Sequence, residues 1–156
     1  MKILSIITIA LLFSGCAVMY TPPKSGPVAK IQFKNDAQRK LLISFFDVST
    51  NCKGRRNIKP ILPNNEATHS IPAGKEITFQ YYLTNFNGFG GEAYCLMNLR
   101  FFAKPNNNYI FKTSEDSNSC KWYMTNETNK EKPIKIKLKA LEWIRGFNEN
   151  SSFCDG

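Results

Sequence analysis

The chain has 156 residues, of which 21 are lysine or arginine and 12 are aspartate or glutamate, so its formal net charge is +9. This length is enough for one domain with a substantial hydrophobic core and all but excludes a second one. The basic balance favours anionic partners such as lipid phosphates, cell-wall polymers or nucleic acid, and it indicates no particular activity.

The first residues have the pattern of a secretory signal peptide. Lys2 supplies an early positive charge, an apolar run occupies residues 3–13, and small residues then lead to Cys16. The run is too short to cross a membrane, because a membrane-spanning helix needs about 20 apolar residues.

The junction Leu12-Phe13-Ser14-Gly15-Cys16 resembles the lipobox of bacterial lipoproteins, in which a signal peptidase cuts before a lipid-modified cysteine. Phe13 departs from the family pattern, which usually has Leu, Val or Ile there. The alternative is an ordinary signal peptide that is cut elsewhere. The resemblance implies removal of residues 1–15, which leaves 141 residues with a net charge of +8, and attachment of fatty acids such as palmitate at Cys16. Several acyl chains make such an anchor stable.

The resemblance also implies a location. Ala17, rather than aspartate, follows the cysteine, and in Gram-negative lipoproteins this pattern is typical of proteins sorted to the outer membrane. For a Gram-negative cell we therefore expect attachment to the periplasmic face of the outer membrane. Nucleic acid is then not an expected partner.

Residues 16–27 are expected to form the lipid anchor and a proline-rich tether. Three prolines and a glycine leave this stretch without periodicity. An extended polyproline-like chain of this length would hold the domain roughly 30 Å from the membrane.

The remainder, 28–156, has the pattern of a β-domain. Apolar and polar residues alternate most clearly along 76–84, whereas 41–48 is continuously apolar. Only 140–146 has the pattern of a short helical turn. Clusters of Asn, Gly and Pro separate the strands, which favours an all-β fold consisting of a single antiparallel β-sandwich, immunoglobulin-like or transthyretin-like in architecture. The seven predicted strands are 28–34, 41–48, 76–84, 95–103, 109–113, 120–125 and 133–139.

Four cysteines follow Cys16, and their even number in an oxidising compartment predicts two disulfides. Four cysteines allow three connectivities. We favour Cys95–Cys120, because each of these residues opens a strand on its apolar face, and then Cys52–Cys154 by elimination. No C-x-x-C spacing favours a metal site.

Enzyme signatures are absent from the sequence. The single histidine, His69, lies in a polar stretch that we interpret as a loop, with no nucleophile motif beside it. The carboxylates are scattered and form no glycosidase-like pair. We therefore expect no catalytic residues, no cofactor and no metal.

Two segments are candidate binding sites. Lys53, Arg55 and Arg56 form a basic cluster with Lys59 in a predicted loop, and paired arginines suit phosphate or carboxylate groups; the alternative is a solvated loop. Phe86 and Phe89 lie in a glycine-rich segment, 86–91, where they either form an exposed binding tip or fold back onto the core.

A further basic feature is the alternation of Lys135, Lys137 and Lys139, interpreted as the solvated face of one strand. The resulting hypothesis is a lipid-anchored periplasmic envelope protein with a non-catalytic binding or scaffolding role, directed to an anionic partner or an envelope protein complex. The alternative is a proteinaceous inhibitor of a periplasmic or exogenous hydrolase, with 86–91 as its plug.

Overall fold

The computed structural model describes residues 18–84, 93–115 and 119–155. Within these ranges the protein is all-β, with eleven strands and no helix. The strands are β1 (Val28–Asn35), β2 (Lys40–Val48), β3 (Lys53–Asn57), β4 (Asn65–Pro72), β5 (Lys75–Thr84), β6 (Ala93–Ala103), β7 (Asn108–Glu115), β8 (Cys120–Asn126), β9 (Ile134–Lys135), β10 (Lys139–Trp143) and β11 (Cys154–Asp155).

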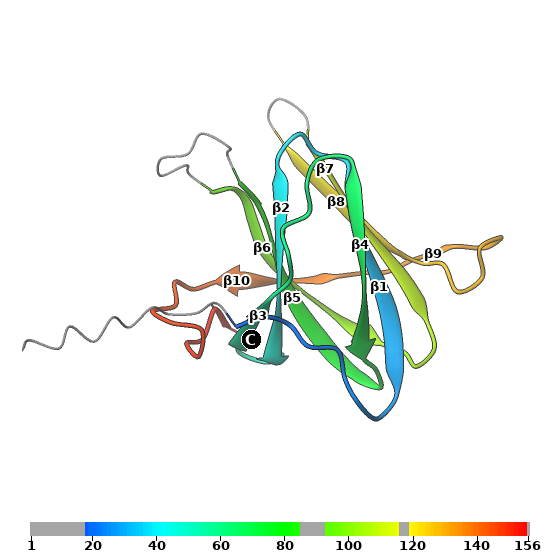
Figure 1. Cartoon of the computed structure of the whole chain (residues 1–156), viewed down its shortest axis with the longest axis horizontal. Coiled ribbons are helices and arrows are strands. Elements are labelled where there is room, and N and C mark those ends of the chain that lie inside the picture. Colours follow the sequence, from blue (N-terminus) through cyan, green and yellow to red (C-terminus); the bar gives the residue numbers. More distant parts are fainter. Residues whose placement is uncertain (1–17, 85–92, 116–118, 156) are drawn as a thin grey trace, which may run out of the picture.

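The strands form the two facing sheets of a sandwich (Figure 1). One sheet has the order β4-β1-β7-β8-β9, and the other has the order β11-β10-β6-β5-β2-β3. Neighbouring strands are antiparallel, except that β1 and β7 run parallel. The all-β sandwich expected from the sequence is confirmed.

The core fills the space between the sheets with alternate side chains of each strand, as the period of two requires. Phe79 of β5 lies near its centre and is fully buried. The ring centroid of Phe79 is 5.1 Å from that of Phe111 on β7 and 5.5 Å from that of Phe33 on β1. These contacts between aromatic rings join the two sheets.

Two features close one side of the sandwich. The disulfide Cys95–Cys120 joins β6 of one sheet to β8 of the other. The chain between β9 and β10 also passes from one sheet to the other, and Ile136 and Leu138 pack against the core on the way.

The prediction of one strand at 133–139 and a helical turn at 140–146 is wrong. Residues 134–135 pair with β8, whereas 139–143 form a strand of the other sheet, in which 139–141 pair with β6 and 142–143 pair with β11. A run that alternates apolar and polar residues has the same sequence pattern whether it remains in one sheet or crosses between two. In both cases every second side chain packs against the core. Pairing with the open edge of β6 overrides the weak helical pattern.

Candidate functional site

The N-terminal part of the described chain pairs with the edge strand β3. The backbone N–H of Tyr20 donates to the carbonyl oxygen of Asn57 at 2.8 Å, and the N–H of Asn57 donates to the carbonyl oxygen of Val18 at 2.9 Å. An edge strand offers unpaired backbone groups that favour such an addition. The chain is therefore held on the domain from its first described residue.

The side chain of Tyr20 reinforces this docking. Its ring centroid is 4.5 Å from that of Phe45, and its hydroxyl donates to the carbonyl oxygen of Ser70 at 2.8 Å. Burial raises the pKa of Tyr20 to about 12, so the hydroxyl remains a donor at physiological pH. The extended spacer expected over residues 16–27 is therefore not found from residue 18 onward, because an aromatic side chain holds this segment against the sandwich.

Replacing Tyr20 with alanine should lower the free energy of unfolding by about 2 kcal/mol, roughly half the cost of removing a fully buried aromatic ring. Trypsin cleavage after the exposed Lys24 should accelerate in the same variant, because the segment loses its contact with Phe45. Urea unfolding and timed proteolysis measure the two effects. Tyr123→Ala, on the exposed face of β8, is the control and should change stability by no more than about 0.5 kcal/mol. Equal behaviour of the two variants would contradict the docking.

Lys53, Arg55 and Arg56, which were predicted in a loop, lie on the strand β3, and Arg55 is paired with a carboxylate of this chain. Its Nε and Nη2 donate to the two carboxylate oxygens of Glu149 at 2.6 and 2.9 Å. Its guanidinium also lies over the ring of Phe153, 4.4 Å from the centroid. This hydrogen-bonded ion pair lowers the pKa of Glu149 below its ordinary value.

Arg56 also binds a carboxylate of its own chain. Its Nε and Nη2 both donate to one oxygen of Asp47 on the adjacent strand β2, at 2.9 and 2.6 Å. Both arginines are therefore paired with carboxylates of this chain, and their role in binding an external anion stays a prediction. Of the same cluster, Lys53 and Lys59 are exposed.

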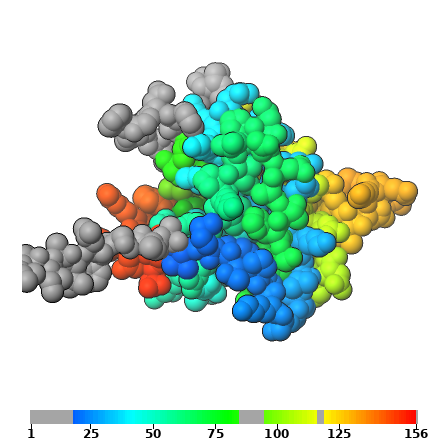
Figure 2. Space-filling view, viewed as in Figure 1, coloured from blue at the N-terminus to red at the C-terminus, as the bar shows by residue number. Residues whose placement is uncertain are grey.

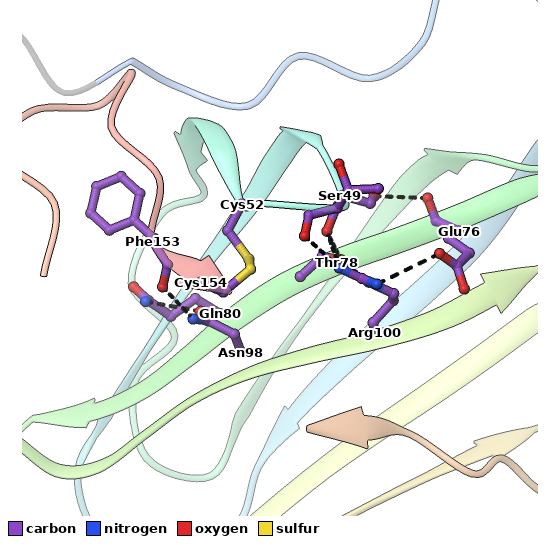
Figure 3. The surroundings of a disulfide bond; sticks show 10 residues. Ser49, Cys52, Glu76, Thr78, Gln80, Asn98, Arg100, Phe153 and Cys154 are labelled. Atoms are coloured by element: carbon purple, nitrogen blue, oxygen red, sulfur yellow. Dashed lines mark hydrogen bonds and ion pairs between the residues drawn. A yellow bond between two sulfur atoms is a disulfide. The ribbon is translucent and has the colours of Figure 1, made fainter. Parts of the chain in front are cut away.

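The C-terminal segment, residues 149–155, lies over the outer face of the six-stranded sheet. A second disulfide, Cys52–Cys154, fixes it to the start of β3 (Figure 3). Phe46, Leu141 and Phe153 bury their side chains around this disulfide and form a small second core. The disulfide connectivity favoured from the sequence is the one found, but the position of this segment was not foreseen.

A polar layer beneath the segment satisfies its backbone. The side-chain amide of Asn98 donates to the carbonyl oxygen of Phe153 at 2.8 Å, and the amide of Gln80 donates to Asn98 at 3.1 Å (Figure 3). These hydrogen bonds fix the position of the C-terminal segment relative to the sheet.

Arg100 extends this layer and is only 7% exposed. Its Nη2 donates to the carbonyl oxygens of Ser49 and Thr50 at 2.6 and 2.9 Å, and its Nε donates to the hydroxyl of Thr78 at 3.2 Å (Figure 3). One buried guanidinium therefore fixes the turn that leads to Cys52.

Two surface hollows flank the chain after β3. The first, of about 560 Å³, is lined mainly by apolar groups together with His69, and the second, of about 520 Å³, lies over the outer face of the six-stranded sheet. His69 lies on strand β4 rather than in a loop, and burial lowers its pKa below the ordinary value because it disfavours the charged imidazolium. Across the described ranges no group of three or more His, Cys, Asp or Glu side chains is arranged to hold a metal ion.

Several residues singled out in the sequence lie outside the described residues. These are Cys16 and the aromatic pair Phe86 and Phe89. In the part of the chain that is described, no helix has the length and apolarity needed to cross a membrane.

Sequence reasoning missed two residues that organise this surface. Tyr20 carried a signal, because it is the single aromatic side chain between Cys16 and the first predicted strand. Glu149 carried none, since it lies 94 residues from Arg55 in sequence.

Comparison with known proteins adds no assignment to this surface. No protein-family model matches the chain, and no curated protein sequence is significantly similar to it.

Proposed function

We propose that this protein is a lipoprotein of the cell envelope, attached through Cys16 to the periplasmic face of the outer membrane, where it has a non-catalytic binding or scaffolding role. The observation that carries the proposal is the cysteine that directly follows small residues at the end of a short apolar run. The two disulfides support it, because they suit an oxidising compartment outside the cytoplasm.

In this proposal the function depends on where the domain is held. The lipid confines the protein to a surface, and a domain stapled by two disulfides presents a fixed face there. The formal net charge of +9 becomes +8 when residues 1–15, which include Lys2, are removed, and this positive charge attracts anionic envelope components. Because Arg55 and Arg56 already hold carboxylates of this chain, exposed lysines such as Lys53 and Lys59 supply that attraction.

The anchor is tested by replacing Cys16 with serine in cells that express the full chain. The unmodified protein should incorporate a labelled fatty acid and remain with the membranes after a high-salt wash. Cys16→Ser should lose the label completely and appear in the soluble envelope fraction, because the thiol that carries the diacylglyceryl group is gone.

The matched control is Ser25→Ala, an exposed change in the segment that follows the cysteine. It should keep both the label and the membrane association. Labelling that persists in Cys16→Ser would refute the proposed anchor.

A further inference from the structure

The outer face of the six-stranded sheet is divided into a covered and an uncovered half. The C-terminal segment covers one half. In the other half, Leu42 on β2, Tyr82 on β5 and Leu96 on β6 are successive cross-strand partners that form an apolar row. Each of these side chains is partly exposed, and none belongs to either buried core.

Two hollows lie over this row and share part of their lining. One is lined by Met19 and Lys59 and the other by Trp143 and Arg145, and both are lined by Tyr82. The uncovered half therefore extends from the docked N-terminal segment to β10.

Large apolar side chains surround this region. Phe147 is 99% exposed, and Met19, Trp143 and Ile144 are each between 42 and 49% exposed. Ten large apolar side chains are exposed in the described ranges, and five of them, Val18, Met19, Trp143, Ile144 and Phe147, belong to two neighbouring segments of the chain. Such a concentration is typical of a contact surface.

The point where the N-terminal segment meets the domain lies beside the C-terminal segment. The N–H of Arg55 donates to the carbonyl oxygen of Glu149, and the N–H of Asn57, on the same edge of β3, donates to that of Val18. Residues two apart on a strand are about 7 Å apart. Val18 is therefore a close neighbour of the loop that carries Phe147. Figures 1 and 2 agree, because the start of the described chain (dark blue) and the C-terminal segment (red) lie on the same side of the domain.

The distance from the anchor follows from this docking. Val18 is two residues after Cys16, and two residues span at most about 7 Å. Because Tyr20 holds the segment on β3, no spacer separates the domain from the anchor. An acylated Cys16 therefore brings this edge of the domain into reach of lipid headgroups.

We propose that the surface formed by Trp143, Ile144 and Phe147, with Met19 and the apolar row beside it, lies on the membrane to which the protein is anchored. Its occupant is the headgroup layer of phospholipids, with anionic lipids favoured by Lys59 and Arg145. This inference rests on the proposed lipid anchor. Aromatic side chains with flanking basic residues have the composition of proteins that contact the membrane–water interface.

The chain contains two tryptophans, one on each sheet, and these report which face meets the lipid. Trp143 is 44% exposed on the proposed surface, whereas Trp122 packs against the core from β8. The full-length lipidated protein is reconstituted into phosphatidylcholine vesicles with or without phosphatidylglycerol, containing acyl chains brominated near the headgroup. Trp122→Phe isolates the emission of Trp143, and Trp143→Phe isolates that of Trp122.

The emission of Trp143 should fall at least about twofold with brominated lipid, and further with phosphatidylglycerol, while Trp122 should remain unquenched. Phe147→Glu should reduce the quenching of Trp143 without changing stability, because Phe147 is fully exposed. Tyr123→Glu on β8 of the other sheet is the matched control and should leave the quenching unchanged.

Flotation of the vesicles separates failure of this inference from failure of the anchor. Protein that does not float after a high-salt wash overturns the anchor, and this inference with it. Protein that floats while Trp143 and Trp122 are equally unquenched overturns the membrane-facing surface alone. Quenching of Trp122 rather than Trp143 would show that the opposite sheet faces the lipid.

Discussion

Replacing both Cys52 and Cys154 with serine is expected to lower the free energy of unfolding by about 5 kcal/mol. The two residues are 102 positions apart, and a cross-link that closes a loop of this length removes more chain entropy from the unfolded state than any shorter one. The native state loses contacts as well, since Cys154 is buried in the small core with Phe46 and Phe153.

The second disulfide provides an internal comparison. Cys95 and Cys120 are 25 positions apart, and the same chain-entropy relation gives about 3.5 kcal/mol for the loop that they close. The double serine variant at these positions should therefore be the more stable of the two. Urea unfolding followed by circular dichroism measures both values. An equal or smaller loss for Cys52 and Cys154 would mean that the C-terminal segment remains in place without its covalent link.

The two double serine variants should also differ in which part of the structure is loosened. Removal of Cys52–Cys154 releases a segment that lies outside the sandwich, so Trp143 and the loop with Phe147 should lose their fixed positions before the sheets separate. Removal of Cys95–Cys120 loosens the two sheets themselves, because that disulfide joins β6 to β8. Hydrogen exchange distinguishes these outcomes, since it reports local and global opening separately.

Alternation in the sequence predicted the strand at 76–84, but it misled at 133–139, where the run crosses between the two sheets, and it missed strands that are defined by their partners. The run 76–84 corresponds to β5 (Lys75–Thr84) with its inward residues as expected. In contrast, β4 (Asn65–Pro72) buries only Ile71 and has no apolar face. This strand forms because it pairs with eight residues of the antiparallel strand β1. The residues of β1 lie far from β4 in the sequence, so the local pattern does not reveal the pairing.

The same reasoning explains why the basic cluster was misinterpreted. The local sequence around Arg55 and Arg56 is charged and contains Gly54, which is typical of a loop. Gly54 does adopt a left-handed conformation, with φ of +68°, but the chain then continues as β3. The two carboxylates that neutralise the arginines lie 9 and 94 residues away. Neither distance in sequence suggests a contact.

The second large effect is expected for Arg100→Leu, which should lower the free energy of unfolding by about 3 kcal/mol. The substitution fills much of the same volume but removes the charged donor that the carbonyl oxygens of Ser49 and Thr50 share. Hydrogen bonds from charged groups each contribute about 1.5–3 kcal/mol. The carbonyl oxygen of Ser49 keeps the hydroxyl of Thr78 as a donor at 2.9 Å, whereas that of Thr50 loses its charged donor. Thermal or urea unfolding measures the change, with Arg145→Leu as the control on an exposed arginine, which should change stability by no more than about 0.5 kcal/mol.

The conservative variant Arg100→Lys separates charge from geometry. Arginine reaches two carbonyl oxygens and the hydroxyl of Thr78 because its donors form a planar fork, whereas an ammonium group concentrates its donors at one point. Lysine should therefore recover only part of the stability lost in the leucine variant. Full recovery would show that positive charge alone holds the turn before Cys52. Because this turn positions the disulfide that fixes the C-terminal segment, partial recovery should be accompanied by faster hydrogen exchange in residues 149–155 than in the core strand β5.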